Sequence, residues 1–539
     1  MKRLLILFVI GASSILVACN VKYFEGAEFD DNIVFDPSIA VVFGELNYTV
    51  GELFEQLNDA NAGVTSNSEG VVTIVYSEQL QSQNAQDFLQ VPDQSFGSSL
   101  PGGVNLSNPP ATTIITVSES YVFDLSQRAA ESFDSIYFQA GRFEFEVLSD
   151  FNAEINFEAT FTSLKASGIA LKMNGTLTPG NNSFNQVEDL SGYKGFFHLD
   201  TNGNPTSNKF RVDISYDVEV TPTTSISSTD RISFVAGMTN TKFDAVYGFV
   251  DNQELAVSFE IVNFDFFSQF DLGNITFADP RVDFVFNNSF GFPLGVDFQQ
   301  ITATNREGQS VSLQGAIISQ LNQVAGPLLE NEGTTETTAI EINKDNSNLV
   351  DLLSSQPERV VVDVKAFSNP SGVPFQYNFI NDESLLDVGV NIEIPFDMNI
   401  DGLQAEESMP FTPPAEIDKA KRLMIRLSSE NQIPLSGLVE VEFLNANNVV
   451  VHSFDEQAIF EAAAVGSNGR TTEAALGTAD FLLEEEDIQS IKNASRIRLL
   501  VTLTTTDADQ GASVKLFDDY ELKFKVSGQL DITVDAKGN

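Results

Sequence analysis

The chain has 539 residues, with 29 Lys or Arg against 76 Asp or Glu, and its formal net charge is −47. A surface of this charge repels nucleic-acid phosphates and anionic lipid headgroups, so nucleic acid is excluded as a partner. The chain holds one Cys and two His, too few for a zinc site, which needs three or four nitrogen or sulfur ligands.

The first residues have the pattern of an export signal. Lys2 and Arg3 are followed by the apolar run 4–16 and then by small residues up to Cys19. The run is too short to span a bilayer, which needs about 20 apolar residues. The sequence therefore predicts a signal peptide over residues 1–18.

The end of this signal, Leu16-Val17-Ala18-Cys19, resembles the bacterial lipobox. The resemblance implies that Cys19 is acylated, with fatty acids such as palmitate, and becomes the new N-terminus. Several acyl chains together anchor a protein stably. The alternative is an ordinary signal peptide with an accidental Cys, although Cys19 is the only cysteine of an exported chain and so has no disulfide partner.

The residue after Cys19 bears on the destination. Asn20 stands where Asp would signal retention in the inner membrane. We therefore expect a lipid-anchored protein of the bacterial cell envelope, at the outer membrane, with its periplasmic or cell-surface face left open. Residues 19–36 are expected to be a tether.

The next segment, 37–114, has the pattern of strand, helix and strand followed by a long loop. Thr49 is the expected N-cap of the helix, and Leu53, Phe54 and Leu57 are expected on its buried face. Residues 81–113 are rich in Gln, Ser, Pro and Gly, which predicts a loop.

Strand patterns dominate the rest of the chain. Apolar and polar residues alternate over 142–161, 209–220, 254–267 and 388–400, as in half-buried antiparallel strands. The chain has 45 Phe and no Trp. Phe at this density on alternating strands favours sandwich core over a ligand box, although a Phe-lined interior could also hold an apolar guest.

Two similar stretches indicate an internal repeat. "NNSFGFPLGVDF" (287–298) and "SENQIPLSGLVEVEF" (429–443) each join two strand patterns through a corner with Asn and Pro-Leu. Pro lacks an amide donor and fits a bend between strands. Each stretch is followed by a strand, a short amphipathic helix and a strand, with apolar helix faces expected at Leu349, Leu352 and Leu353 in the first and at Ile488 and Ile491 in the second.

The order of these elements resembles the late-embryogenesis-abundant type 2 (water stress and hypersensitive response) β-sandwich, over about residues 274–370 and 417–526. The lipobox, the "NSFGFPL" and "NQIPL" corners and the terminal "VKLFDDYELKFKVSGQLDI" resemble large Bacteroidota envelope lipoproteins of unassigned role. The predicted fold is mostly β, with tandem antiparallel β-sandwich modules that each carry a short packed helix. The expected segments are 1–18 signal peptide, 19–36 tether, 37–114 N-terminal region, 115–270 central β region, 271–372 repeat 1, 373–415 connecting strands and 416–539 repeat 2.

Catalytic and metal-binding patterns are scarce. His198 and His452 both lie on strand patterns, and neither is accompanied by the G-x-S-x-G turn of a serine hydrolase. Asp200 and Asp507 begin acidic loops, but both loops fail the calcium-loop pattern, since Pro205 stands at the sixth position of the first, where Gly is needed. Calcium is thus a possible partner without a supporting motif, and no cofactor, metal or catalytic residue is predicted.

Three functions remain open. The favoured one is a non-enzymatic structural or interaction lipoprotein whose loops or sheet edges contact envelope proteins. The second is a module that binds or transfers lipid or another apolar ligand, motivated by the Phe-rich strands and by the late-embryogenesis resemblance, whose relatives include proposed lipid carriers. The third is a hydrolase that uses paired carboxylates, which would need a cleft where two acids converge.

Overall fold

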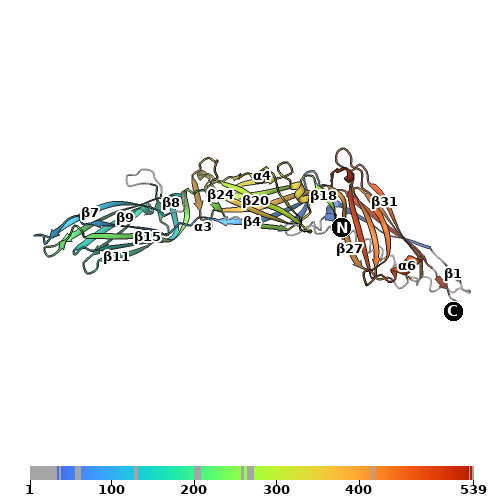
Figure 1. Cartoon of the computed structure of the whole chain (residues 1–539), viewed down its shortest axis with the longest axis horizontal. Helices are drawn as coiled ribbons and strands as arrows, with labels where there is room; N and C mark the ends of the chain where they lie inside the picture. The colour runs from blue at the N-terminus through green and yellow to red at the C-terminus, as the bar shows by residue number, and fades with distance from the viewer. Residues whose placement is uncertain are drawn as a thin grey trace.

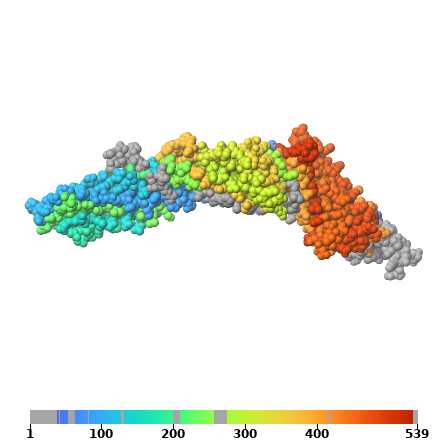
Figure 2. All heavy atoms as spheres, viewed as in Figure 1, coloured from blue at the N-terminus to red at the C-terminus, as the bar shows by residue number. Residues whose placement is uncertain are grey.

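The chain forms an elongated row of three β-rich modules (Figures 1 and 2). The structure is a computed structural model that describes residues 33–35, 38–54, 62–126, 131–198, 208–255, 260–263, 272–413, 417, 419–532 and 534–536. Antiparallel pairing connects its strands. The fold is therefore mostly β with tandem sandwich modules, as the sequence predicts.

The first module, in blue and teal in Figure 1, is one ten-stranded sheet that folds over on itself. Its two layers meet through Phe side chains, because Phe96 stacks on Phe210 with ring centroids 4.4 Å apart. A short two-stranded sheet of β6 and β14 accompanies it. The short helix α3 (Ala85–Phe88) lies at the junction with the middle module, where Phe88 packs on Phe290 with ring centroids 5.5 Å apart (Figure 1). The strands of the first module are β5 (Gln94–Pro101), β6 (Leu106–Ser107), β7 (Thr113–Asp124), β8 (Ser132–Ser149), β9 (Glu154–Ala166), β10 (Ile169–Leu177), β11 (Ser183–Asp189), β12 (Lys194–Phe196), β13 (Lys209–Val220), β14 (Ser225–Ile226) and β15 (Arg231–Phe249).

The middle module packs a five-stranded sheet, ordered β23-β19-β26-β4-β3, against a six-stranded sheet built around β24 and β20. β25 (Asn378–Asn381) precedes β26 in the chain but pairs with β15 of the first module. The elements are β3 (Ala62–Ser66), β4 (Val72–Asn84), β16 (Glu254–Leu255), β17 (Glu260–Asn263), β19 (Arg281–Asn288), β20 (Leu294–Asn305), β21 (Ser310–Ser312), α4 (Ala316–Ser319), β22 (Asn322–Val324), η4 (Leu329–Asn331), β23 (Glu336–Ile342), α5 (Leu349–Ser354), β24 (Pro357–Ser368) and β26 (Leu385–Pro395).

The third module, in orange and red, pairs a four-stranded sheet ordered β2-β34-β28-β31 with a six-stranded sheet ordered β18-β27-β32-β29-β30 and extended by β33. The short pair β1–β35 lies beyond it, at the end of the row (Figure 1). The elements are β1 (Ile33–Phe35), β2 (Ser38–Thr49), α2 (Val50–Phe54), β18 (Leu272–Phe277), β27 (Asp397–Pro410), β28 (Ala420–Asn431), β29 (Leu435–Leu444), β30 (Val450–Phe460), β31 (Ala475–Glu484), α6 (Glu485–Ile491), β32 (Arg496–Thr505), η6 (Ala508–Gln510), β33 (Val514–Lys515), β34 (Glu521–Ile532) and β35 (Val534–Ala536).

The middle and third modules have corresponding topology. The order β23-β19-β26-β4 matches β31-β28-β34-β2, and the pair β20–β24 matches β29–β32. Each module has its helix, α5 or α6, immediately before the last strand of that pair. The helix faces are buried as predicted, at Leu349, Leu352 and Leu353 in α5 and at Ile488 and Ile491 in α6.

The N-terminal segment is shared among the modules. β2 pairs with β34 of the third module, and β4 pairs with β26 of the middle module. Strand pairing thus crosses the segment boundaries drawn from the sequence. Thr49 is an N-cap as predicted, since its Oγ1 accepts a hydrogen bond of 3.2 Å from the Glu52 amide; Leu57 lies outside the described residues.

The prediction of a long loop over residues 81–113 is wrong in part. β5 lies within it and pairs with β15. Its buried residues alternate among Ser and Gly, with Phe96 and Leu100 in the core. The turn-forming composition concealed a strand because an edge position tolerates Ser, Gly and Pro on its outer face.

Backbone hydrogen bonds join neighbouring modules. Between the middle and third modules, Val72 donates to Leu516 O over 2.9 Å, Leu516 to Phe396 O over 2.8 Å, and Phe396 to Val72 O over 2.7 Å. Between the first and middle modules, β25 extends the first sheet through pairs such as Tyr247 with Phe379.

Among the described residues, every helix is too short or too polar to cross a membrane.

Candidate functional site

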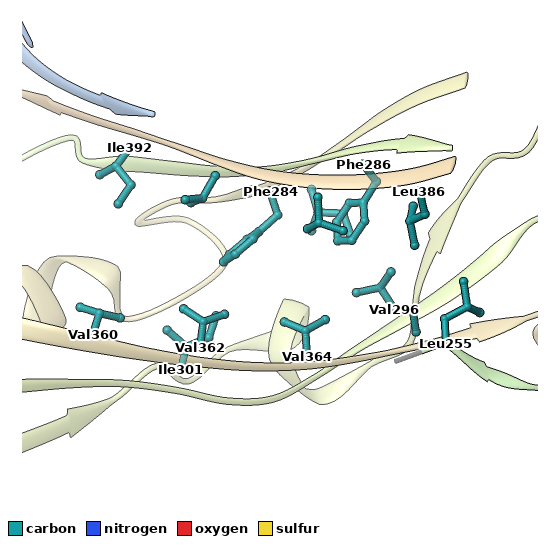
Figure 3. Packing of buried hydrophobic residues seen from close by; sticks show 14 of the residues in the cluster. Leu255, Phe284, Phe286, Val296, Ile301, Val360, Val362, Val364, Leu386 and Ile392 are labelled. Carbon is teal, nitrogen blue, oxygen red and sulfur yellow. The ribbon is translucent and has the colours of Figure 1, made fainter. Parts of the chain in front are cut away.

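The interior of the middle module is a candidate site for an apolar ligand. Phe284, Phe286, Leu386 and Ile392 from β19 and β26 point toward side chains from β20 and β24 on the facing sheet (Figure 3). These residues are buried, with Phe286 fully so. The alternation of apolar residues on each strand places them on one face, so two inner faces form one core.

A small cavity remains beside α5 in this core. Its volume is about 40 Å³, and its walls are apolar. Ligand pockets usually hold about 300–1,000 Å³, so this cavity has no room for an acyl chain while α5 stays in place. The lining side chains are Val282, Phe284, Ile301, Leu313, Ile342, Leu349, Leu352, Leu353, Val360, Val362, Val390 and Ile392.

The Phe-rich interior of the first module is filled by aromatic rings. Phe143 meets Phe161 edge to face with ring centroids 4.6 Å apart, and Phe145 meets the same ring at 5.1 Å. A cavity of about 10 Å³ lies near Phe133 and Phe138. The rings fill the space between the layers and stabilise it through edge-to-face contacts.

The two predicted corners are built around buried Asn side chains. Asn288 Nδ2 donates to the carbonyls of Phe292 and Ala325 over 3.0 Å, and Asn288 Oδ1 accepts from the Phe290 amide over 3.0 Å. Both Asn288 and its counterpart Asn431 are fully buried.

The second corner repeats this geometry. Asn431 Nδ2 contacts the carbonyls of Leu435 at 2.9 Å and Glu461 at 2.7 Å, and Oδ1 accepts from the Ile433 amide over 2.8 Å. In each corner one amide replaces the backbone partners that the strands lose at the bend. These motifs of the sequence are therefore structural.

The two histidines lie in different modules. His198 Nδ1 is 3.4 Å from the Asp134 carbonyl in the first module. His452 on β30 has Nδ1 3.3 Å from Asp487 Oδ1, while its Nε2 is buried and has no hydrogen-bond partner among the described residues. A serine triad needs a hydroxyl at that second nitrogen, and the ring instead faces Phe454 edge-on with centroids 5.0 Å apart.

Other predicted positions are partly outside the described residues. Cys19 and Asp200 fall outside them, so the acylation site and the first acidic loop stay predictions. Asp507 begins the turn at η6 with φ of 55°, and Gly511 ends it with φ of 71°. Within the described ranges, no group of three or more His, Cys, Asp or Glu side chains is arranged to hold a metal ion.

Sequence reasoning missed a surface groove of about 510 Å³ between residues 328–330 and 373–377. Phe375 is 75% exposed at its edge, and Leu328 and Leu329 are 49% and 44% exposed. The available signal was "SGVPFQY" (371–377), in which an aromatic residue stands beside turn-forming residues and outside any alternating strand pattern.

Comparison with known proteins gives no family for this chain. No family model matches it, and no curated protein matches it. Solved structures with some likeness include a Parabacteroides distasonis protein assigned as secreted, 15% identical, with a TM-score of 0.31, covering 52% of this chain and 83% of that one.

Two further structures are similar over parts of their length. One is from infectious bursal disease virus, Gx strain, 10% identical, with a TM-score of 0.14, covering 83% of this chain and 81% of that one. Another is the tandem CBM22 domain of Paenibacillus barcinonensis Xyn10C, 9% identical, with a TM-score of 0.14, covering 50% of this chain and 82% of that one. TM-scores this low carry no argument about function.

Proposed function

We propose that this chain is a lipid-anchored, non-enzymatic structural and interaction protein of the bacterial cell envelope. The observation that carries the proposal is a row of three sandwiches joined by backbone hydrogen bonds, such as those among Val72, Phe396 and Leu516. Strands that cross module boundaries stiffen such a row, since bending it would break their pairing. A stiff row suits a spacer that holds one end away from a surface.

The position of the first described strand gives the proposed orientation. β1 begins at Ile33 and lies beyond the third module, at the opposite end from β7 (Figure 1). A lipid on Cys19 would thus place the third module nearest the membrane. The first module would then stand farthest from the outer membrane, on either its periplasmic or its cell-surface side.

The lipid anchor is tested by Cys19→Ala. We expect the variant to leave the membrane fraction, because the acyl chains would supply the binding free energy. Fractionation of cells followed by immunoblotting measures this, and retention of the variant in membranes would overturn the anchor.

The orientation is tested separately on the lipidated protein in vesicles. Two single variants each carry one dye on an introduced cysteine at an exposed position. Ala111→Cys lies just before β7 in the first module, and Gln489→Cys lies on α6 in the third module. We expect energy transfer to acceptor lipids from position 489 and much less from position 111. Equal transfer would show that the row lies flat and would contradict the spacer.

A second candidate, binding of an apolar ligand, is favoured by the cavity under α5. It requires α5 to move, because the cavity holds about 40 Å³. Native mass spectrometry with lipid extraction tests it. A bound lipid at fixed stoichiometry would support the carrier function. A protein mass without ligand would contradict it and leave the spacer as the proposed function.

A further inference from the structure

The groove beside Phe375 gathers exposed apolar side chains from two separate segments. Leu328 and Leu329 come from the start of η4, and Val373, Pro374 and Phe375 come from the turn that follows β24. Elsewhere, large exposed residues such as Ile169 and Leu476 lie in other modules. Apolar side chains gathered in a concave surface mark an interaction site.

The walls of the groove are held in place by hydrogen bonds. Gln376 Nε2 donates to the Pro327 carbonyl over 2.8 Å, which ties the turn to the segment before η4. The Phe375 ring stacks on Phe249 with centroids 5.7 Å apart. Pro370 and Pro374 restrict the turn further. A surface that is already ordered loses little conformational entropy on binding.

Two tyrosines connect the groove to the first module, Tyr377 from the groove wall and Tyr247 from β15. Tyr377 OH donates to Asp134 Oδ2 over 2.9 Å, and Tyr247 OH donates to Glu332 Oε1 over 2.7 Å. Burial raises the pKa of both phenols above the ordinary value, and the accepting carboxylates raise each pKa further. Both phenols therefore stay neutral donors at physiological pH.

The described residues that line the groove include one charged side chain, the carboxylate of Glu330, and no Lys or Arg. Glu330 lines the groove itself, and Glu332 follows it. Charge complementarity thus favours a cationic partner.

We propose that this groove docks a protein segment in which a bulky apolar side chain is flanked by Lys or Arg. The apolar side chain would pack on Phe375 and Leu329, and the basic residues would face Glu330. This inference rests on the proposed function in that it names the class of partner for an interaction protein. A second copy of the chain is a poor occupant, because its net charge of −47 would be repelled.

The test pans a library of random dodecapeptides on the chain from residue 20 onward, which keeps every described residue. Enriched peptides are then measured by fluorescence anisotropy. We expect enrichment of Lys or Arg next to Phe, Leu or Ile. We also expect Phe375→Gln to weaken their binding about tenfold or more, as for an anchor residue that becomes buried in the complex.

Matched variants separate the groove from nonspecific adhesion. Leu476→Gln changes a side chain that is 77% exposed in the third module, and it should leave the affinity unchanged. Glu330→Gln should weaken binding and reduce its dependence on salt, because one rim charge is lost.

Peptides without basic bias, or binding that Phe375→Gln leaves unchanged, would overturn the docking proposal. A preference for acidic peptides or for copies of this chain would do the same. None of these outcomes affects the energy-transfer test of orientation, so failure of the groove and failure of the spacer are distinguishable.

Discussion

Asn288 and Asn431 show how one residue type secures a bend between two strands. Each amide is fully buried and contacts backbone groups on more than one segment. Removal of such a group leaves buried carbonyl and amide groups without partners, at a cost of about 1–3 kcal/mol for each. The Pro-Leu corner therefore depends on the Asn that precedes it.

Asn431→Ala is expected to lower the free energy of unfolding of the third module by about 3 kcal/mol. Differential scanning calorimetry measures this as an earlier transition. Asn447→Ala, at an exposed turn position, is the control and should change little. Equal stability of the Asn431 variant and the control would show that the corner holds without the amide.

The buried phenol of Tyr216 is expected to make the stability of the first module depend on pH. It is buried in the first module, its OH donates to the Leu100 carbonyl over 3.4 Å, and burial raises the pKa to about 12. The unfolded chain would release this proton near its ordinary pKa of about 10. The stability that the protonated Tyr216 phenol gives the folded state is therefore fully present below about pH 10. It is lost as the pH rises through about 12.

We expect the first module to lose stability over that alkaline range and Tyr216→Phe to lose less of it. Denaturant unfolding at several pH values measures the difference between the two proteins. Identical pH slopes would contradict a role for this phenol.

At the scale of elements, α5 and α6 close one side of their sandwiches. α6 has a capping box, in which the Glu484 amide donates to Asp487 Oδ2 over 3.0 Å. α5 has no side-chain cap, and its three buried Leu residues hold it in place. Packing, more than helix propensity, stabilises a helix this short.

Leu352→Ala is expected to destabilise the middle module by about 2–5 kcal/mol, because it enlarges the cavity beneath α5. Asp351→Ala changes an exposed neighbour on the same helix and should have a small effect. Thermal unfolding compares the two variants. Equal unfolding temperatures would mean that α5 contributes little to closure.

At the scale of the whole molecule, the N-terminal strands complete modules that are distant in sequence. β2 pairs with β34 along its length, from Ser38 opposite Asp531 to Thr49 opposite Glu521. Without β2, the edge of β34 would be unpaired, and exposed edges promote aggregation.

A chain that begins at Ala62 should therefore aggregate or unfold at a lower temperature in its third module. A chain that begins at Ser38 keeps β2 and should behave like the longer protein. Light scattering during heating distinguishes them. Comparable behaviour of the two truncated chains would show that β2 is dispensable.

The sequence by itself determined the elements whose signal is local. Strand alternation over Lys209–Val220, the corner at Pro434 and the apolar faces of both helices follow from periodicity and from the fixed φ of proline. The acidic composition likewise set the class of partner that the surface would repel.

Only the tertiary structure decided which strands pair and where exposed residues gather. β2 and β34 are separated by most of the chain, and pairing at that separation leaves no local pattern. Phe375 and Leu329 meet at one groove because the turn after β24 folds against the segment before η4, where Gln376 donates to the Pro327 carbonyl. Local sequence records what each residue prefers, whereas a surface depends on contacts between segments that folding brings together.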